Sequence, residues 1–348
     1  MDILQIFLPN YFQGRIRKLP KPLNLFINQL QINRLNMQVI LGAGGSIGRE
    51  LARELKQYTS QIRLVSRTPE KVNPDDELFP ATLLDKQQVM KAVEGAKVAY
   101  LTVGLPYSLK IWREQWPVMM QNVLDACAHH KVKLVFFDNI YLYDGSNLNP
   151  IKETNPVNPP SEKGKVRAAI AGMLWKAVES GKVEALIARA ADFYGPQMEK
   201  SSVLCETIVA PLLAGKAANV LVGDNFKHSY THTAEAAKAT ALLGNTPEAY
   251  SQVWHLPTAK NPLTGKEMVE LVAREIGVAP KYRVVSKTMI KMMGWLMPIM
   301  KEMHEMLYQN DKDYVFNSDK FEEKFGMHPR SYEEGIRELV RNSLKQRS

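Results

Sequence analysis

The sequence has few cysteines, no long hydrophobic run and no cluster of basic residues. Two cysteines among 348 residues, Cys127 and Cys205, exclude a disulfide scaffold and fit a reducing cytosol, so we expect a cytoplasmic protein. No apolar run reaches the roughly 18 residues of a transmembrane helix, so no integral membrane association is expected. The cysteines and the seven histidines show no metal-ligand spacing, and no metal is predicted.

The formal net charge of +9 is not concentrated on one part of the folded chain. The first 36 residues carry five basic side chains against one acidic side chain, and the remaining excess is spread over the rest without a basic block. A surface that follows a phosphate backbone needs clustered lysine and arginine. The charge pattern therefore predicts no nucleic-acid partner and leaves a small-molecule substrate as the expected ligand.

Residues 1–36 have a composition of their own, with apolar side chains at positions 3, 4, 6, 7 and 8 and prolines at 9, 20 and 22. Three interpretations compete: a disordered extension, an amphipathic arm that touches a membrane, and a targeting peptide. A secretory signal is disfavoured because a continuous apolar segment and a small-residue cleavage site are both missing. We favour an N-terminal extension that is disordered and adds nothing to the fold.

A glycine-rich turn follows the first strand-like run, Val39-Ile40-Leu41, and leads into a segment with apolar residues at helical spacing. Strand, glycine turn and helix in this order predict a dinucleotide site. The first glycine permits the tight turn, the next lets backbone approach a pyrophosphate, and the last lets helix and strand pack closely. The helix N-terminus then faces the phosphates. The predicted cofactor contacts in this turn are Gly42, Gly44, Gly45, Ser46, Ile47 and Gly48.

From residue 38 onward, strand-like runs alternate with helical stretches, which predicts an α/β fold with a Rossmann-like, doubly wound parallel sheet. The expected strands are 38–43, 62–67, 78–84, 98–104, 134–138 and 183–190, and the expected helices are 46–58, 86–94, 111–130 and 162–180. We therefore assign residues 37–195 to a nucleotide-binding domain, whose ligand would lie at the carboxyl ends of the strands.

Beyond about residue 195 the rhythm changes to helical runs at 201–215, 232–243 and 264–277. Residues 196–345 are expected to form a smaller, mainly helical substrate lobe, with a return to the sheet near 230–256. A methionine-rich stretch at 289–306 could line a pliable apolar pocket or meet a membrane surface, but packing within the lobe is the favoured interpretation.

The end of the second strand indicates which dinucleotide binds. An acidic residue there would bond the ribose 2′-hydroxyl of NAD, whereas a nearby arginine accommodates the 2′-phosphate of NADP. The chain has Ser66-Arg67-Thr68 at this position and no acid before Glu70. Arg67 can pair with a phosphate, so NADP(H) is favoured over NAD(H). The alternative is that Arg67 is a solvated charge at the end of the strand.

Several segments in order resemble the extended or atypical short-chain dehydrogenases/reductases of the NAD-dependent epimerase/dehydratase family. Besides the glycine turn, these are Leu83-Leu84-Asp85, residues 122–127, Leu142-Tyr143-Asp144-Gly145 and residues 189–196. The resemblance extends from Met37 to about residue 340. It implies hydride transfer with a nicotinamide cofactor, and further cofactor contacts from Asp85, Thr102 and Lys165.

The catalytic positions depart from the family pattern of a Ser/Thr followed by a Tyr-x-x-x-Lys pair. The resemblance places Asn139 at the Ser/Thr position and Lys165 at the lysine position, but Ser161 stands where tyrosine is expected. Tyr141 lies where side chains of the family reach the substrate, and we nominate it as general acid/base. A nearby lysine would lower its pKa. The alternative is that Tyr141 and Tyr143 are half-buried aromatics at a strand end.

Two substrate positions also differ from the sugar-nucleotide members. Asp192 stands where they have asparagine, and His228 stands where they often have arginine. Both exchanges remove positive potential from a diphosphate site. The predicted function is an NAD(P)(H)-dependent oxidoreductase or epimerase acting on a carbonyl or alcohol that is sugar-like or small and apolar. The rival is a non-catalytic NADP(H)-binding sensor, and a homodimer is compatible with either.

Overall fold

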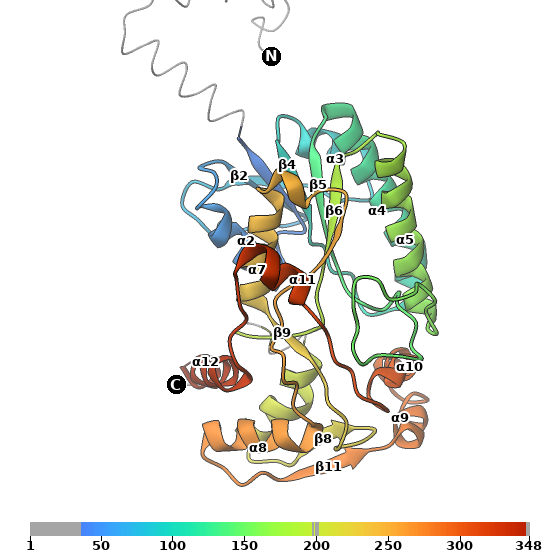
Figure 1. The fold of residues 1–348 in the computed structure, drawn as a ribbon, viewed down its shortest axis with the longest axis vertical. Helices are drawn as coiled ribbons and strands as arrows, with labels where there is room; N and C mark the ends of the chain where they lie inside the picture. Colours follow the sequence, from blue (N-terminus) through green and yellow to red (C-terminus); the bar gives the residue numbers. More distant parts are fainter. Residues whose placement is uncertain (1–35, 197, 199–201, 346–348) are drawn as a thin grey trace, which may run out of the picture.

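A computed structural model describes residues 36–196, 198 and 202–345. The expectation for the N-terminal arm concerns residues 1–36, and residues 1–35 of that arm lie outside the described residues. The described chain forms a parallel sheet flanked by helices, with a smaller lobe beyond one end of the strands (Figure 1). The predicted Rossmann-like α/β fold is therefore confirmed.

The central sheet has seven parallel strands in the order β10-β6-β5-β4-β1-β2-β3. Strands β1 and β4 are buried over their whole length, because helices cover both faces of a parallel sheet. Their continuous apolar sequences are what this environment requires. The bounds are β1 Gln38–Leu41, β2 Ile62–Ser66, β3 Glu77–Pro80, β4 Val98–Leu101, β5 Lys133–Asp138, β6 Ala185–Arg189 and β10 Val253–His255.

Two groups of helices enclose the sheet. On one face, α3 (Lys86–Val93), α4 (Leu109–His130) and α5 (Glu162–Glu179) pack side by side and share one apolar core with the strands. On the other face, α2 (Ser46–Leu55) packs against α7 (Thr233–Gly244) over a second core. Helix α11 (Asp319–Phe325) returns from the far end of the chain and adds Phe321 to that core.

The smaller lobe contains short strands as well as the expected helices. Strand β7 (Asp192–Tyr194) pairs with β9 (Tyr230–His232), and β8 (Ala218–Leu221) pairs with β11 (Tyr282–Val285). A third core joins these strands to the π-helix Cys205–Val209, α6 (Ala210–Leu213), α8 (Gly265–Ile276) and α12 (Tyr332–Lys345). Strand β10, between these segments in sequence, adds the last strand to the large sheet.

The methionine-rich stretch forms two short helices instead of one continuous stripe. Helix α9 (Lys287–Met293) and helix α10 (Pro298–His304) pack against each other, with four residues between them. The break follows from Pro298, which disfavours a helical residue before it and itself begins α10. Both helices are short, and no helix in the described part of the chain is long and apolar enough to span a membrane.

Candidate functional site

The glycine turn takes its shape from two close approaches of backbone. Gly42 has φ +106°, and a Cβ there would lie 2.5 Å from the backbone of Val103, after β4. A Cβ on Gly48 would lie 2.8 Å from the Cα of Ala43, so helix α2 can approach the turn only with glycine there. Gly45 is the N-cap of α2, and no side chain caps the first turn. The geometry leaves a helix N-terminus beside an open turn.

The surface of this turn has room and unused hydrogen-bonding groups for a nucleotide. Gly44 and Gly45 are exposed, and a Cβ on either would meet nothing closer than 3.8 Å. The hydroxyls of Ser66, at the end of β2, and Thr102, just after β4, are buried without a hydrogen-bond partner among the described residues. Buried polar groups are nearly always bonded, so these two indicate a missing polar ligand. The residues present fit a dinucleotide.

The other predicted cofactor residues have different surroundings. Ser46 and Ile47 begin helix α2, as the turn requires. Arg67 is exposed just after β2, and it has no hydrogen-bond or ion-pair partner in the part of the chain that the structure describes. Asp85 is the N-cap of α3, and its two oxygens accept from the backbone and side chain of Gln88 at 3.0 and 3.2 Å. The observed role of Asp85 is thus to cap a helix.

Tyr141, the predicted acid/base, belongs to an aromatic group at the ends of β4 and β5. Its ring stacks on Trp112 with 6.3 Å between centroids, and its hydroxyl hydrogen-bonds with Tyr107. Asn139 accepts a hydrogen bond from the backbone N–H of Tyr141 at 3.1 Å, which fixes the turn. Burial raises the pKa of Tyr141 well above its usual value near 10, so the expectation of a lowered pKa is wrong.

Asp192 lies among these tyrosines, although it comes from β7. Its Oδ2 is 2.9 Å from Nε2 of His228, and that imidazole stacks on Tyr314 with centroids 4.3 Å apart. The predicted substrate residues are therefore in direct contact. Besides burial, which is the main cause, the Asp192 carboxylate raises the pKa of five tyrosines, because a phenolate near it would be repelled. We call these the tyrosine cluster: Tyr107, Tyr141, Tyr230, Tyr308 and Tyr314.

The predicted lysine and the lysine beside the cluster are different residues. Lys165 is 60% exposed, and its ammonium pairs with Glu162 at 2.5 Å. Lys163 is completely buried, its Nζ lies 4.6 Å from the Tyr107 ring centroid, and it pairs with Glu302 and Glu305 of the lobe. One lysine thus lies at the surface and the other in the interior, because two residues along a helix turn the side chain through about 200°.

Ser161, at the position where the family has tyrosine, has a structural role. It is buried and caps α5, accepting a hydrogen bond from the N–H of Gly164 at 3.0 Å. The sequence did not predict Lys163, Tyr107, Tyr230, Tyr308 or Tyr314 as site residues. Lys163 could have been considered from the sequence, because it is a lysine two residues before the predicted Lys165. The tyrosines gave no such signal, because they come from distant segments of the chain.

Behind the tyrosine cluster lies a buried charge network that the sequence did not predict. Asp138, at the end of β5, accepts from Arg167 at 2.8 Å and from Arg189 at 3.1 Å, and all three side chains are nearly inaccessible. Arg189 also donates to the hydroxyl of Tyr143 at 2.9 Å. Three elements, β5, β6 and α5, are therefore joined through one carboxylate.

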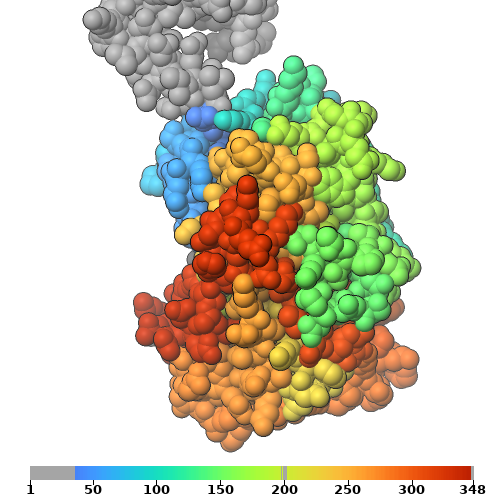
Figure 2. Space-filling view, in the orientation of Figure 1, coloured from blue at the N-terminus to red at the C-terminus, as the bar shows by residue number. Residues whose placement is uncertain are grey.

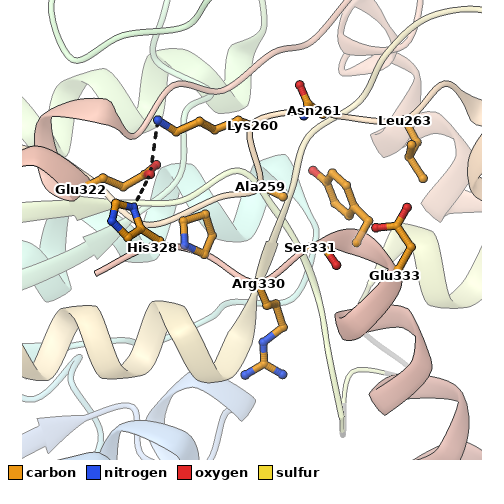
Figure 3. Close-up of a pocket in the computed structure, with 11 residues that line it drawn as sticks. Ala259, Lys260, Asn261, Leu263, Glu322, His328, Arg330, Ser331 and Glu333 are labelled. Atoms are coloured by element: carbon orange, nitrogen blue, oxygen red, sulfur yellow. Dashed lines mark hydrogen bonds and ion pairs between the residues drawn. The ribbon is translucent and has the colours of Figure 1, made fainter. Parts of the chain in front are cut away.

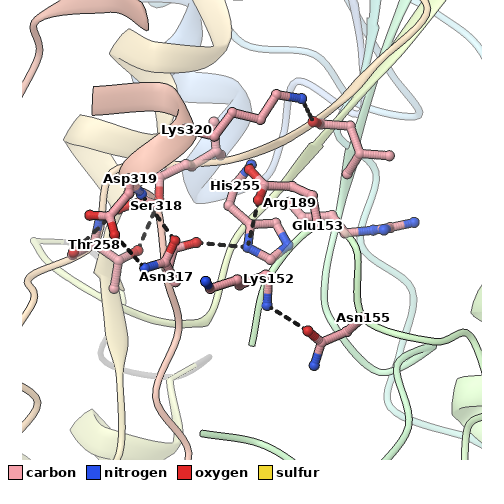
Figure 4. Close-up of polar contacts among 12 residues, drawn as sticks. Lys152, Glu153, Asn155, Arg189, His255, Thr258, Asn317, Ser318, Asp319 and Lys320 are labelled. Carbon is pink, nitrogen blue, oxygen red and sulfur yellow. Dashed lines mark hydrogen bonds and ion pairs between the residues drawn. The ribbon is translucent and has the colours of Figure 1, made fainter. Parts of the chain in front are cut away.

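The network continues to His255 on β10, which contacts the lobe (Figure 4). Nδ1 of His255 lies 2.9 Å from the carbonyl oxygen of Asn317, so it must carry the proton. Nε2 then accepts from the hydroxyl of Tyr143 at 2.9 Å. Burial lowers the pKa of His255 to about 3, which keeps the ring neutral. Tyr143 is thus a structural residue within this network.

A surface cavity of about 450 Å³ lies elsewhere, between residues 259–263 and the segment 328–333 (Figure 3). Its walls carry ion pairs of Glu322 with Lys260 and with His328. Arg330 beside it is occupied by Glu235. None of the predicted site residues lines this cavity. Among the described residues, no group of three or more His, Cys, Asp or Glu side chains could hold a metal ion.

Comparison with known proteins assigns the fold and the family. The family model described as "NAD dependent epimerase/dehydratase family" matches residues 38–254, which is well over half of the chain. The chain belongs to this family. No curated protein sequence matches it. Family membership confirms the resemblance inferred from the ordered segments, and the matched range covers the glycine turn, Asp138 with its two arginines, and the first part of the lobe.

Several solved structures share the fold at low sequence identity. UDP-glucose 4-epimerase of Thermus thermophilus, solved with NAD, is 18% identical with a TM-score of 0.70, over 88% of this chain and 98% of the other. The dTDP-glucose 4,6-dehydratase DesIV of Streptomyces venezuelae is 16% identical with a TM-score of 0.72, over 89% and 98%. UDP-N-acetylglucosamine 4-epimerase of Methanobrevibacter ruminantium M1 is 16% identical with a TM-score of 0.73, over 89% and 98%.

Proposed function

We propose that the protein is an NADP(H)-dependent oxidoreductase or epimerase of this family that acts on a carbonyl or alcohol group. The observation that carries the proposal is that the glycine turn and two members of the tyrosine cluster, Tyr107 and Tyr141, follow the carboxyl ends of strands in one parallel sheet. Ligands of such sheets bind at that edge. The cofactor supplies or accepts the hydride when bound, and the protein has to position and polarise the substrate.

The tyrosine cluster suits hydrogen-bond donation to a substrate oxygen. The pKa of Tyr141 and of Tyr107 is raised, mainly by burial, so both hydroxyls stay protonated at neutral pH. Because the two hydroxyls are hydrogen-bonded to each other, one of them donates within the pair and the other has a proton left for a substrate oxygen. Donors fixed in a buried site stabilise an oxygen on which negative charge develops. Asp192 and His228 then face the remainder of the substrate. Asn139 holds the turn that carries Tyr141, and Lys165 remains a proposed ligand of the nicotinamide ribose.

The substrate class follows from charge. Solved relatives of the same fold are sugar-nucleotide enzymes by their descriptions, and two of them carry UDP-glucose in the crystal. In this chain Asp192 puts a carboxylate 2.9 Å from the imidazole Nε2 of His228. A diphosphate would be repelled by that carboxylate. We therefore include smaller or more apolar carbonyls and alcohols with the sugar-like substrates.

Replacing Tyr141 with phenylalanine is expected to lower kcat about tenfold with little change in KM, since one hydrogen bond to the developing charge is lost. The measurement is steady-state NADPH oxidation on the best substrate from a panel of aldehydes, ketones and sugar nucleotides. Tyr143→Phe is the comparison, because the Tyr143 hydroxyl is engaged by Arg189 and His255. It should lower stability and leave kcat near that of the unmodified protein. An unchanged kcat in Tyr141→Phe contradicts the role of Tyr141.

The preference for NADP(H) rests on the end of β2. Ser66 stands where an acidic residue would favour NAD, and the next residue, Arg67, is exposed without a partner among the described residues. On the neighbouring helix, Arg49 is paired with Glu70 at 2.5 Å, which leaves Arg67 as the cation available to a 2′-phosphate.

Arg67→Ala is expected to raise the Kd of NADPH about tenfold or more and to change the Kd of NADH less than about twofold, because only NADPH carries the phosphate. Titration of intrinsic fluorescence with each nucleotide measures both constants. Lys56→Ala, which removes another cation, paired with Asp75, is the control. Equal effects of Arg67→Ala on the two nucleotides exclude the NADP preference.

A non-catalytic NADP(H) sensor is the second candidate, and Ser161 is the observation that favours it. The family's tyrosine position is occupied by a buried helix cap that has no acid/base capacity. Tight NADPH binding without turnover on the whole panel supports the sensor. Turnover that depends on Tyr141 supports the enzyme.

A further inference from the structure

Helices α9 and α10 present an apolar surface that nothing in the described chain covers. Trp295 is 85% exposed and Leu296 is 88% exposed, in the turn between the two helices. Single exposed apolar residues are common, but a contiguous group marks a contact surface. Further large apolar side chains of the same segment are exposed, and we call the whole group the α9–α10 tip: Met289, Met292, Met293, Trp295, Leu296, Met297 and Ile299.

Ion pairs and hydrogen bonds fix the α10 side of the tip to the rest of the protein. The carboxylates of Glu302 and Glu305 pair with the buried ammonium of Lys163 at 2.5 and 2.7 Å. They also accept from the backbone N–H groups of Leu109 and Glu162, so α10 is fastened to the starts of α4 and α5. The apolar side chains therefore point outward from an anchored support.

Around the α9–α10 tip, the acidic side chains point into the protein and the basic side chains point into solvent. The acidic residues of α10 and the residue after it, Glu302 and Glu305, are turned inward to Lys163. Lys291 and Lys301 are exposed and have no ion-pair or hydrogen-bond partner among the residues the structure describes. Helix α9 contains no acidic residue. The outward charge beside the apolar tip is thus positive.

We propose that the α9–α10 tip docks on the surface of an anionic phospholipid bilayer. Tryptophan, leucine and methionine at the end of a protruding hairpin can enter the headgroup region, and flanking lysines can remain at the phosphates. Each lysine near an anionic surface strengthens binding about fivefold. Peripheral docking of this kind needs no membrane-spanning helix.

The surface itself favours a bilayer over a second copy of the chain. The tip lies at one corner of the molecule, next to β8 and β11 (Figures 1 and 2). To bind another copy, a protruding Trp295 and Leu296 need an apolar recess. The cavity described above carries Lys260 and Glu322 in its walls, and a second surface cavity, between residues 61–63 and residues 94–95, carries Arg63 and Glu77, so neither is an apolar recess. A lipid surface needs no such recess.

Sedimentation of the full chain with vesicles tests the proposal. Binding is expected to vesicles of phosphatidylcholine with phosphatidylserine and to be at least tenfold weaker with phosphatidylcholine alone. The double variant Trp295→Ser/Leu296→Ser should lose at least about tenfold in affinity, and Lys291→Gln/Lys301→Gln should lose about tenfold or more. The matched controls, Val157→Ser/Leu344→Ser and Lys91→Gln/Lys176→Gln, change exposed residues of other elements and should bind like the unmodified protein.

Tryptophan fluorescence supplies an independent measurement. Trp112, Trp116 and Trp254 are buried, whereas Trp295 is exposed, so vesicles should shift the emission of Trp295 to shorter wavelength. Trp295→Phe should remove that shift while the protein still sediments. Vesicle binding that survives Trp295→Ser/Leu296→Ser overturns the proposal. So does a dimer, seen by light scattering without vesicles, that dissociates in the same variant.

Discussion

Asp138→Asn is expected to lower the free energy of unfolding by about 3–5 kcal/mol. The Asp138 carboxylate is completely buried and compensates two buried guanidinium groups, those of Arg167 and Arg189. Asparagine keeps the shape of the side chain but removes the negative charge. The two cations would then remain in the interior without a counterion, on neighbouring elements of the sheet and α5. The loss is therefore electrostatic, with packing nearly unchanged.

Chemical unfolding followed by circular dichroism measures this loss. Asp125→Asn is the matched control, because Asp125 pairs with Lys86 at the surface, where an ion pair is worth less than about 1 kcal/mol. Equal destabilisation by the two substitutions means that Asp138 does not compensate the arginines. The slope of the unfolding curve should stay the same in both variants, since the area exposed on unfolding does not change.

Gly42→Ala is expected to weaken NADPH binding at least about 100-fold and to lower the free energy of unfolding by about 2–4 kcal/mol. The new Cβ would lie 2.5 Å from the Cα and N of Val103, and the backbone has φ +106°. Backbone cannot yield as a flexible side chain can. The segment after β4 must move away, and with it the unpartnered hydroxyl of Thr102.

Fluorescence titration with NADPH and chemical unfolding separate the two effects. Gly45→Ala should weaken NADPH binding without loss of stability, because its Cβ would meet only the carbonyl oxygen of Gly42 at 3.8 Å. Gly172→Ala in α5, where a Cβ would meet nothing within 4 Å, should leave binding unchanged. Unaltered NADPH affinity in Gly42→Ala means that the dinucleotide does not bind at this turn.

The two predictions concern the same edge of the sheet. Asp138 is the last residue of one strand, and Gly42 directly follows another. Asp138 ends β5 just before Asn139 and Tyr141, and Gly42 follows β1 beside the segment after β4. Movement at either position would shift the donors proposed for the substrate relative to the nucleotide. Stability and function are thus connected at this edge of the sheet.

Local sequence predicted the glycine turn and the elements around it well. A strand, a turn and a helix depend on neighbouring residues, so Val39 to Leu55 could be assigned from their pattern alone. Strand ends were less accurate. The strand expected at 98–104 ends at Leu101, because the backbone of Val103 passes against Gly42 instead of continuing the ladder. That approach involves residues about 60 positions apart.

The candidate site was likewise predicted only in part from the sequence. Asp192 and His228 were singled out separately as substrate residues, and the structure brings them to 2.9 Å. The tyrosine cluster was not predicted, because its members come from four separate segments of the chain and share no spacing. The expected fall in the pKa of Tyr141 was wrong for a related reason. It assumed a nearby lysine, whereas burial among other tyrosines dominates.

By itself the sequence determined a Rossmann-like protein of the epimerase/dehydratase family, with a glycine turn at residues 42–48 between a strand and a helix. It could do so because that turn needs only glycines between a strand and a helix. Only the tertiary structure decided that Lys163 is buried while Lys165 is exposed, and that Asp138 compensates two arginines. Burial and charge compensation depend on which distant segments pack together, and no short pattern in the sequence encodes that.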